Sequence, residues 1–457
     1  MQKVLDQIRS SEESHLEELQ EFLRIPSISA DSSHEKDMVR CAEWVSKSLK
    51  RIGLERTEIF RTAGHPLVYG EWLGAEGKPT ILVYGHYDVQ PVDPLELWQT
   101  GPFEPSIRDG KIYARGATDD KGQVLIHFKA AEAHLQVTGK LPVNVKFLIE
   151  GEEEVGSANL DRFIAENLDL LRADAAVISD TAMFDRDLPT ITYGLRGLAY
   201  SQIDLQGPSG DLHSGSFGGA VANPGEILSR LLSAMKDERG RVAIPGFYDE
   251  VRPLTDKERE IFRSLPFDEE RYKRELGVEA LAGEEGFSTL ERVWARPTFE
   301  INGLLSGFTG EGAKTVLPAR AMAKVSMRLV ADQDPERIAD QFEAHLRALC
   351  PPTVRLTLTR MHGGKPSLVP IDHAAVQAGG RALEKGFGRA PVFIREGGSI
   401  PVVATFSEQL GIPTVLVGFG LPNENAHAPN EHLHLSNFRR GVASIAHLYD
   451  ELSRTRL

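Results

Sequence analysis

Histidine and carboxylate side chains follow four separate apolar runs of this 457-residue sequence. The runs and the side chains that follow them are 81–84 with His86 and Asp88, 143–149 with Glu152, Glu153 and Glu154, 175–179 with Asp180, and 413–417 with His427. Imidazole nitrogens and carboxylate oxygens are ligands that Zn²⁺ and Mn²⁺ accept. These residue types therefore indicate chemistry at a metal centre.

Their position after apolar runs suggests how they could meet. Continuous apolar runs separated by helices are typical of strands buried on both faces of a parallel sheet, and sites form beyond the carboxyl ends of such strands. Taken singly, Asp180 could cap a helix and His427 could be an ordinary loop histidine. Four instances at four strand ends favour a shared site.

Two pairs of residues add detail to this site. His86 and Asp88 are two positions apart, so in an extended chain they point to the same face. A ligating histidine commonly donates its other N–H to a carboxylate, so we interpret Asp88 as the group that orients His86. Asp119 and Asp120 lie in a glycine-flanked turn. They are either a helix N-cap with its neighbour, or one of them is a carboxylate that bridges two metal ions.

Two histidines with several carboxylates suit a pair of Zn²⁺ or Mn²⁺ ions. Two such ions ~3.5–4 Å apart can hold a water between them and polarise a carbonyl group. The reaction then needs a general base close to the ions. Adjacent glutamates at one strand end can supply both a ligand and that base.

The elements that must position these groups follow from the apolar pattern. Residues 2–24, 37–52 and 121–135 are expected to be helical, the last as a crossover between strands. Residues 200–205 and 321–330 alternate like half-buried strands of an antiparallel or mixed sheet, and the charged stretch 236–296 between them reads as solvated helices.

The predicted fold class is α/β, with a mostly parallel sheet flanked by helices in a catalytic domain that an α+β lid or dimerisation domain interrupts. The expected boundaries are 1–190 for the first part of the catalytic domain, 191–388 for the inserted domain and 389–457 for the second part. We place the return near residue 390 because a strand like those of the first part follows it.

Composition excludes several classes of function. Hydrophobic residues make up 41% of the chain, enough for large cores, and the formal net charge is −14. A chain with this much negative charge repels the phosphate backbone of nucleic acids, and we therefore do not expect nucleic acid as a partner. Only two cysteines occur, Cys41 and Cys350, which fits a reducing cytosol. No apolar run approaches the ~18 residues that span a membrane, so we expect a cytoplasmic protein.

Five stretches of the sequence resemble the M20 metallopeptidases. They are residues 85–91 (GHYDVQP), 114–122, 150–157, 178–180 (ISD) and 425–427 (NAH). The likeness is greatest to the dipeptidase branch, the carnosinases and cytosolic non-specific dipeptidases, and it covers nearly the whole chain. The resemblance implies hydrolysis of dipeptides or short peptides through a water held between two metal ions, with a glutamate as general base.

The resemblance also implies a role for each site residue. The implied ligands are His86 and Asp180 for one metal, Glu154 and His427 for the other, and Asp119 as the bridge. Glu153 would be the general base, Asp88 would orient His86, and the peptide bond between Asp119 and Asp120 would be cis. The family usually has a small or hydrophobic residue where this chain has Glu152, so a shifted register with Glu152 as the base stays open.

The middle domain contributes further implied residues. Residues 211–215 (DLHSG) resemble a lid motif whose histidine, here His213, reaches the active site of a partner subunit and stabilises the oxyanion. The resemblance thus implies a homodimer. The implied substrate-binding residues are His213, Thr315, Arg328, His362 and Ser399. Two alternatives to a dipeptidase are an N-acyl amino acid deacylase with the same metals and a non-catalytic dimeric scaffold.

Overall fold

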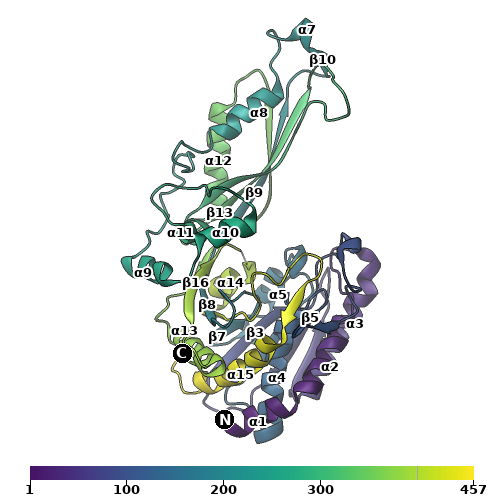
Figure 1. Cartoon of the computed structure of the whole chain (residues 1–457), viewed down its shortest axis with the longest axis vertical. Helices are drawn as coiled ribbons and strands as arrows, with labels where there is room; N and C mark the ends of the chain where they lie inside the picture. The colour runs from purple at the N-terminus through teal and green to yellow at the C-terminus, as the bar shows by residue number, and fades with distance from the viewer. Residues whose placement is uncertain (399) are drawn as a thin grey trace. The chain divides into compact units, whose positions relative to one another are not determined.

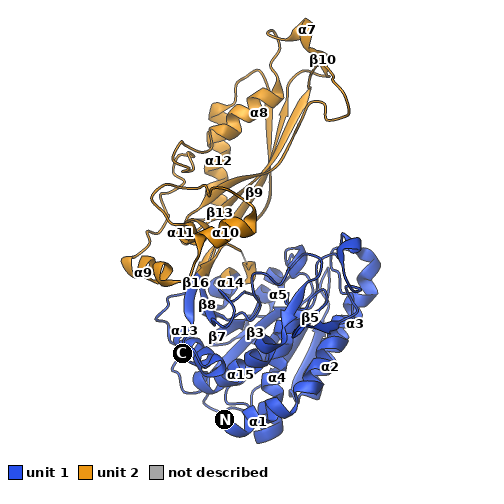
Figure 2. Cartoon of the chain, in the orientation of Figure 1, with its two compact units in different colours: residues 1–193, 369–394, 405–457 blue, residues 194–368, 395–404 orange. Residues whose placement is uncertain are grey.

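The structure, a computed structural model, describes residues 1–398 and 400–457, which form two compact units (Figure 1, Figure 2). Unit 1 comprises Met1–Tyr193, Val369–Ile394 and Thr405–Leu457, and unit 2 comprises Gly194–Leu368 and Arg395–Ala404. The inserted segment 194–368 thus ends earlier than the expected residue 388, and residues 395–404, expected in the second part of the catalytic domain, belong to unit 2. Helix α13 (Ala374–Phe387) belongs to unit 1 because it packs against α15 (Leu435–Leu452).

A mixed sheet lies at the centre of unit 1. Among the described residues its strand order is β1-β2-β6-β3-β7-β17-β8-β15, and β16 also pairs with β8. The strands are β1 (Arg56–Phe60), β2 (Leu67–Trp72), β3 (Thr80–His86), β6 (Asn144–Glu150), β7 (Ala175–Ile178), β8 (Thr190–Leu195), β16 (Val392–Glu396) and β17 (Thr414–Leu416), together with β15 (Ser367–Leu368), whose two residues belong to unit 2. The four central strands, β6, β3, β7 and β17, run parallel, as predicted. Their carboxyl ends therefore lie along one edge.

Helices enclose this sheet. They are α1 (Gln2–Ser10), α2 (Glu12–Leu23), α3 (Glu35–Arg51), α4 (Lys121–Thr138), α5 (Leu160–Glu166), α6 (Leu168–Leu171), α13 and α15. The predicted helix 2–24 is two helices that meet at Ser11. Helix α4 is the predicted crossover, and it is buried along most of its length between the sheet and its neighbours α1 and α15. Among the described residues, none of the helices is both long and apolar enough to cross a membrane.

A small three-stranded sheet of unit 1 lies beside the site loops. Its strands are β4 (Ser106–Arg108), β5 (Lys111–Tyr113) and β18 (His432–His434). Strands β5 and β18 pair antiparallel, with Leu433 opposite Ile112, and both of these side chains are buried. This pairing ties the segment just before the Asp119 turn to the segment just after His427.

Unit 2 is built on an antiparallel sheet with the order β11-β13-β9-β14 among the described residues. Its strands are β9 (Gly197–Gln206), β11 (Thr298–Ser306), β13 (Arg320–Leu329) and β14 (Arg355–Gly364). Burial alternates along β9, which confirms the predicted half-buried strand. Helices α8 (Pro224–Ser233) and α12 (Pro335–Leu349) pack on the sheet.

The remaining elements of unit 2 are short. They are β10 (Leu212–His213), α7 (Ser214–Phe217), α9 (Asp256–Ser264), α10 (Glu269–Leu276), α11 (Thr289–Ala295), β12 (Val316–Leu317) and α14 (Pro401–Thr405). The charged stretch 236–296 contains α9 and α10, which are largely exposed as expected, and α11, which is not a solvated helix because Thr289, Leu290, Glu291 and Ala295 are buried. Each of these three helices begins with a side-chain N-cap, from Thr255, Asp268 and Ser288 respectively.

Candidate metal centre

The carboxyl ends of the parallel strands bring the predicted side chains together. His86 is the last residue of β3, Asp180 follows β7, and Glu154 lies in the turn after β6. Asp119 comes from the turn before α4, and its peptide bond to Asp120 is cis. Two groups of ligating atoms result, each with its atoms within 4.8 Å of one another: His86, Asp119 and Asp180, and Asp119, Glu154 and His427.

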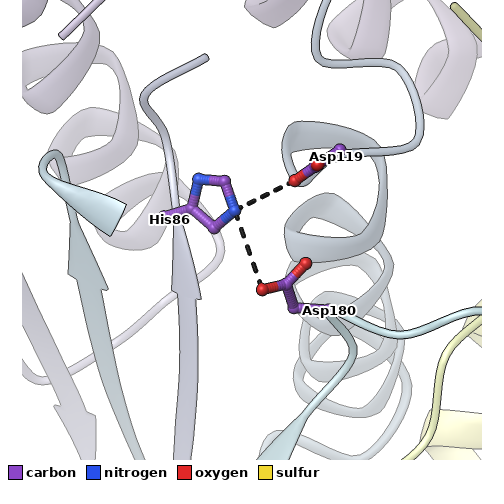
Figure 3. Close-up of side chains that lie close together, drawn as sticks. All are labelled: His86, Asp119 and Asp180. Carbon is purple, nitrogen blue, oxygen red and sulfur yellow. Dashed lines mark ion pairs between the residues drawn. The ribbon is translucent and has the colours of Figure 1, made fainter. Parts of the chain in front are cut away.

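The first group is the more buried (Figure 3). His86 Nε2 lies 3.2 Å from Asp119 Oδ1 and 3.9 Å from Asp180 Oδ2, and the imidazole is fully buried. Figure 3 shows the ring pointing toward both carboxylates. Among the described residues, this buried Nε2 has no hydrogen-bond partner of acceptable geometry. A buried nitrogen lone pair directed at two carboxylates fits a metal ion, which all three groups would coordinate.

The other ring nitrogen of His86 is fixed by Asp88. His86 Nδ1 lies 3.1 Å from the Asp88 carbonyl oxygen and 3.3 Å from Asp88 Oδ1. Both oxygens are acceptors, so Nδ1 carries the hydrogen and Nε2 is left as the donor of an electron pair. Asp88 itself is fully buried and accepts a hydrogen bond from Ser29 Oγ at 2.6 Å. It is not in either ligand group, and its orienting role stays a prediction.

The second group shares Asp119 with the first. Asp119 Oδ2 lies 2.8 Å from His427 Nε2, and His427 Nε2 lies 3.1 Å from Glu154 Oε2. Gln90 Nε2 donates to the same Glu154 oxygen at 2.7 Å. Because the two oxygens of Asp119 face different groups, this carboxylate is placed to bridge two ions.

The clustered carboxylates of the site favour the binding of positive charge. Hydrogen bonds to Asp119 and Glu154 raise the pKa of His427 to about 10. Burial alone would lower the pKa of His86, but the adjacent carboxylates of Asp119 and Asp88 raise it well above its usual value. Burial, followed by repulsion from Asp119, raises the pKa of Asp180 far above its usual range. Such a cluster takes up protons, and metal ions can replace those protons.

The adjacent glutamates Glu152 and Glu153 have different surroundings. Asn159 Nδ2 donates to both carboxylate oxygens of Glu152, at 3.1 and 2.9 Å. Glu153 lies among the site groups, where burial and the nearby carboxylates of Glu154 and Asp119, despite His86, raise its pKa to about 7. The carboxylate of Glu152 is thus already bound by an amide, whereas that of Glu153 belongs to the cluster.

The other predicted site residues belong to unit 2. His213 is exposed, and its Nδ1 accepts the Gly215 N–H at 3.0 Å. Thr315 lies beside it, because the Ser214 N–H donates to the Thr315 carbonyl at 3.1 Å.

Two further residues of unit 2 lie on the antiparallel sheet. Arg328 is half-buried on β13, and burial lowers its pKa. His362 stacks on Tyr200, with ring centroids 5.0 Å apart. Ser399 lies outside the described residues. The substrate-binding roles of these residues remain predictions.

Although a structural role is expected for Glu431, the sequence pattern does not indicate that three further residues hold the proposed ligands. They are Gln90, which binds Glu154, and Glu424 and Glu431, which bind the turn that carries Asp119. Gln90 lies in the GHYDVQP stretch, and the two glutamates flank His427. Only their closeness to His86 and His427 in the sequence could have indicated these three residues. Their spacing from the proposed ligands matches no recognisable motif.

Known proteins resemble this chain over nearly its whole length. It is 34% identical to the Cys-Gly metallodipeptidase DUG1 of Candida albicans, over 97% of this chain and 96% of the relative. It is 31% identical to the Beta-Ala-His dipeptidase of Homo sapiens, over 99% and 93%. Among solved structures, the M20 family metallo-carboxypeptidase Sso-CP2 from Sulfolobus solfataricus matches with a TM-score of 0.87 and 35% identity, covering 96% of this chain and 99% of that one.

A sequence model of one peptidase family matches most of the chain, residues 82–451. Those residues include both candidate ligand groups. On this match and on its full-length likeness to metallodipeptidases, the chain is a metallopeptidase that belongs to peptidase family M20/M25/M40.

Proposed function

We propose that the protein hydrolyses dipeptides or short peptides with two divalent metal ions, Zn²⁺ or Mn²⁺, in the candidate metal centre. The observation that carries this proposal is the position of Asp119 between the two ligand groups, 3.2 Å from His86 Nε2 and 2.8 Å from His427 Nε2. When bound, the ions would polarise the peptide carbonyl and make a water more acidic. The proposed ligands are His86, Asp119, Glu154, Asp180 and His427.

The protein's own groups would move the protons. Glu153 would accept a proton from the attacking water and give it to the nitrogen of the leaving amine. Asp88 would keep the hydrogen of His86 on Nδ1 throughout. The amide bond that Asn159 makes to Glu152 supports Glu153 as the base.

A peptide is favoured over an N-acyl amino acid as the substrate. The relatives from Candida albicans and Homo sapiens, at 34% and 31% identity, are named as dipeptidases, and the solved Sso-CP2, at 35% identity, is named as a metallo-carboxypeptidase. The solved aminohydrolase and amidase that resemble the chain are 12% and 13% identical, so they share only the fold. The guanidinium of Arg328 would bind the carboxylate at the peptide's C-terminus through its planar fork. Thr315, His362 and Ser399 would complete the peptide site.

A homodimer is part of the proposal, with His213 completing the partner subunit's site. Strand β11 ends the described sheet of unit 2 and exposes Ile301, Leu304 and Leu305, each by about half. An apolar sheet edge open to water supports a second copy as its partner. Two free cysteines, Cys41 and Cys350, support the expected cytoplasmic location.

Metal removal and a substrate panel test the proposal. We expect a chelator to abolish hydrolysis of dipeptides such as Cys-Gly, and stoichiometric Zn²⁺ or Mn²⁺ to restore it. The same protein should cleave dipeptides faster than N-acetyl or N-succinyl amino acids. Activity that is indifferent to chelation would contradict the two-metal mechanism, and a preference for acyl amino acids would contradict the peptide substrate.

A further inference from the structure

Glu431 binds the turn that carries the bridging carboxylate. Its side chain is fully buried. Oε1 accepts the backbone N–H groups of Thr118 and Asp119, at 3.0 and 3.1 Å, and Oε2 accepts the Gly116 N–H at 3.0 Å. Arg115 Nη1 also donates to Oε2, at 2.8 Å. One carboxylate thus accepts hydrogen bonds from four of the five residues in 115–119, all except Ala117.

Glu424 binds the same turn from the other side of His427 in the sequence. Its carboxylate is also fully buried, and Oε2 accepts the Thr118 Oγ1 hydroxyl and the Leu421 N–H, both at 2.8 Å. Oε1 accepts the backbone N–H of His434 at 2.9 Å and lies 2.6 Å from His434 Nδ1. Glu424 therefore connects the Asp119 turn to both ends of the segment that contains His427.

We propose that Glu424 and Glu431 are positioning residues that fix the distance between Asp119 and His427, and hence the affinity of the second metal ion. This inference rests on the proposed two-metal function. His427 is half-exposed and lies on an irregular segment, whereas His86 ends a strand inside the sheet. The two glutamates supply the rigidity that the sheet gives to the first group but cannot give to the second.

The chemistry of the site explains why these residues are carboxylates. A carboxylate offers about four acceptor positions and no donor, so Glu431 can satisfy all four N–H groups at once. A glutamine would turn an NH₂ group toward one pair of those N–H donors and push the Asp119 turn away. If Glu431 bound only Arg115, its role would be to stabilise the fold. Its other three donors are backbone N–H groups of the turn that carries Asp119, so Glu431 also sets the position of a proposed ligand.

Metal affinity, measured separately for each group, tests this inference. In an Asp180→Asn background the second group should bind Zn²⁺ alone, and in a His427→Ala background the first group should. We expect Glu431→Gln to weaken binding ~10–100-fold in the first background and clearly less in the second. Competition with a chromophoric chelator on the metal-free protein gives both affinities without an activity assay.

A second variant and a matched control separate positioning from stability. Thr118→Val keeps the shape of the side chain and removes only the hydroxyl bond to Glu424, so it should weaken the second group without unfolding the protein. Glu451→Gln removes a buried acceptor that binds Arg381 and Lys385 on α13. It should lower the melting temperature and leave both metal affinities unchanged.

Distinct outcomes would overturn the two proposals. If the otherwise unaltered protein binds two ions and neither Glu431→Gln nor Thr118→Val weakens the second, the positioning role is wrong while the two-metal function stands. Equal weakening by Glu451→Gln would also contradict the positioning role. If the unaltered protein binds no ions, the proposed function itself fails.

Discussion

The carboxylate of Asp88 accepts the backbone N–H of Glu153 at 3.2 Å. Its other oxygen accepts the N–H of Glu154 at 3.1 Å, and the same side chain lies 3.3 Å from His86 Nδ1. One buried carboxylate therefore sets the tautomer of a proposed ligand and places the proposed base and the next ligand.

Replacing Asp88 with asparagine tests this arrangement. An amide has one acceptor oxygen instead of two and turns an NH₂ group toward either His86 or the glutamate turn. We expect Asp88→Asn to lower both metal affinity and kcat by ~10–100-fold. Ser29→Ala, which removes one donor to Asp88, should cause a much smaller loss. Equal effects of the two variants in metal titrations and steady-state kinetics would contradict the orienting role.

The identity of the general base can be decided with two variants. Glu153→Gln should lower kcat by ~10²–10⁴-fold because no carboxylate can then accept the proton. Its metal content should not change. Glu152→Gln should keep nearly full activity, since Asn159 can still bind the remaining oxygen. The opposite pattern in the same kinetic assay would identify Glu152 as the base.

Arg328 is predicted to bind the substrate's terminal carboxylate. Lysine keeps the charge but cannot donate two parallel hydrogen bonds. We expect Arg328→Lys to raise KM for dipeptides by roughly 10–100-fold, the worth of a charge-assisted bidentate pair. Peptide amides, which lack the carboxylate, serve as the control and should be cleaved equally by both proteins. If Arg328→Lys impairs the cleavage of peptides and of their amides to the same extent, Arg328 does not bind the terminal carboxylate.

Leu304 tests the proposed homodimer. This side chain is 57% exposed on β11, so a lysine there should not disturb folding but should oppose burial against a second copy. We expect Leu304→Lys to produce monomers in sedimentation experiments and to lower activity, because His213 would no longer reach a partner. Leu349→Lys, at a 42% exposed position on α12, is the control. A dimeric Leu304→Lys protein would argue against this edge as the interface.

His15 predicts how stability depends on pH. Burial, and secondarily Lys129, lower its pKa from 6.5 to about 4. A histidine with a lowered pKa stays neutral when folded but takes up a proton when unfolded, so the free energy of unfolding falls as the pH falls from about 6.5 toward 4. The slope from this group is at most ~1.4 kcal/mol per pH unit. Denaturant unfolding of the metal-free protein should show a shallower slope for His15→Gln, and equal slopes would contradict it.

Much of the site could be predicted because strand ends are easy to recognise in the sequence. The proposed ligands His86 and Asp180 lie at the ends of apolar runs, and parallel strands bring such positions to one edge. Glu424 and Glu431 could not be assigned in this way. They act through contacts with the Asp119 turn, more than 300 positions earlier in the chain, and their contacts depend on how the two loops fold together.

The errors in the predicted fold have similar causes. Residues 2–24 show one apolar pattern, and no glycine or proline marks the break at Ser11, so only the packing of both helices on α4 reveals it. Helix α13 has an ordinary amphipathic pattern that fits either unit. Its assignment to unit 1 depends on contacts with α15 and β17, which come later in the chain.

The place of β17 in the sheet has a consequence for synthesis on the ribosome. This strand pairs with β7 and lies between β7 and β8, yet it emerges only after all of unit 2 has been made. Until then the nascent chain presents an open β7 edge, which can pair wrongly with other chains. The His427 segment is translated later still. Because Glu424 and Glu431, which bind the Asp119 turn, are translated together with that segment, a growing polypeptide cannot fix either ligand group until the segment has been made.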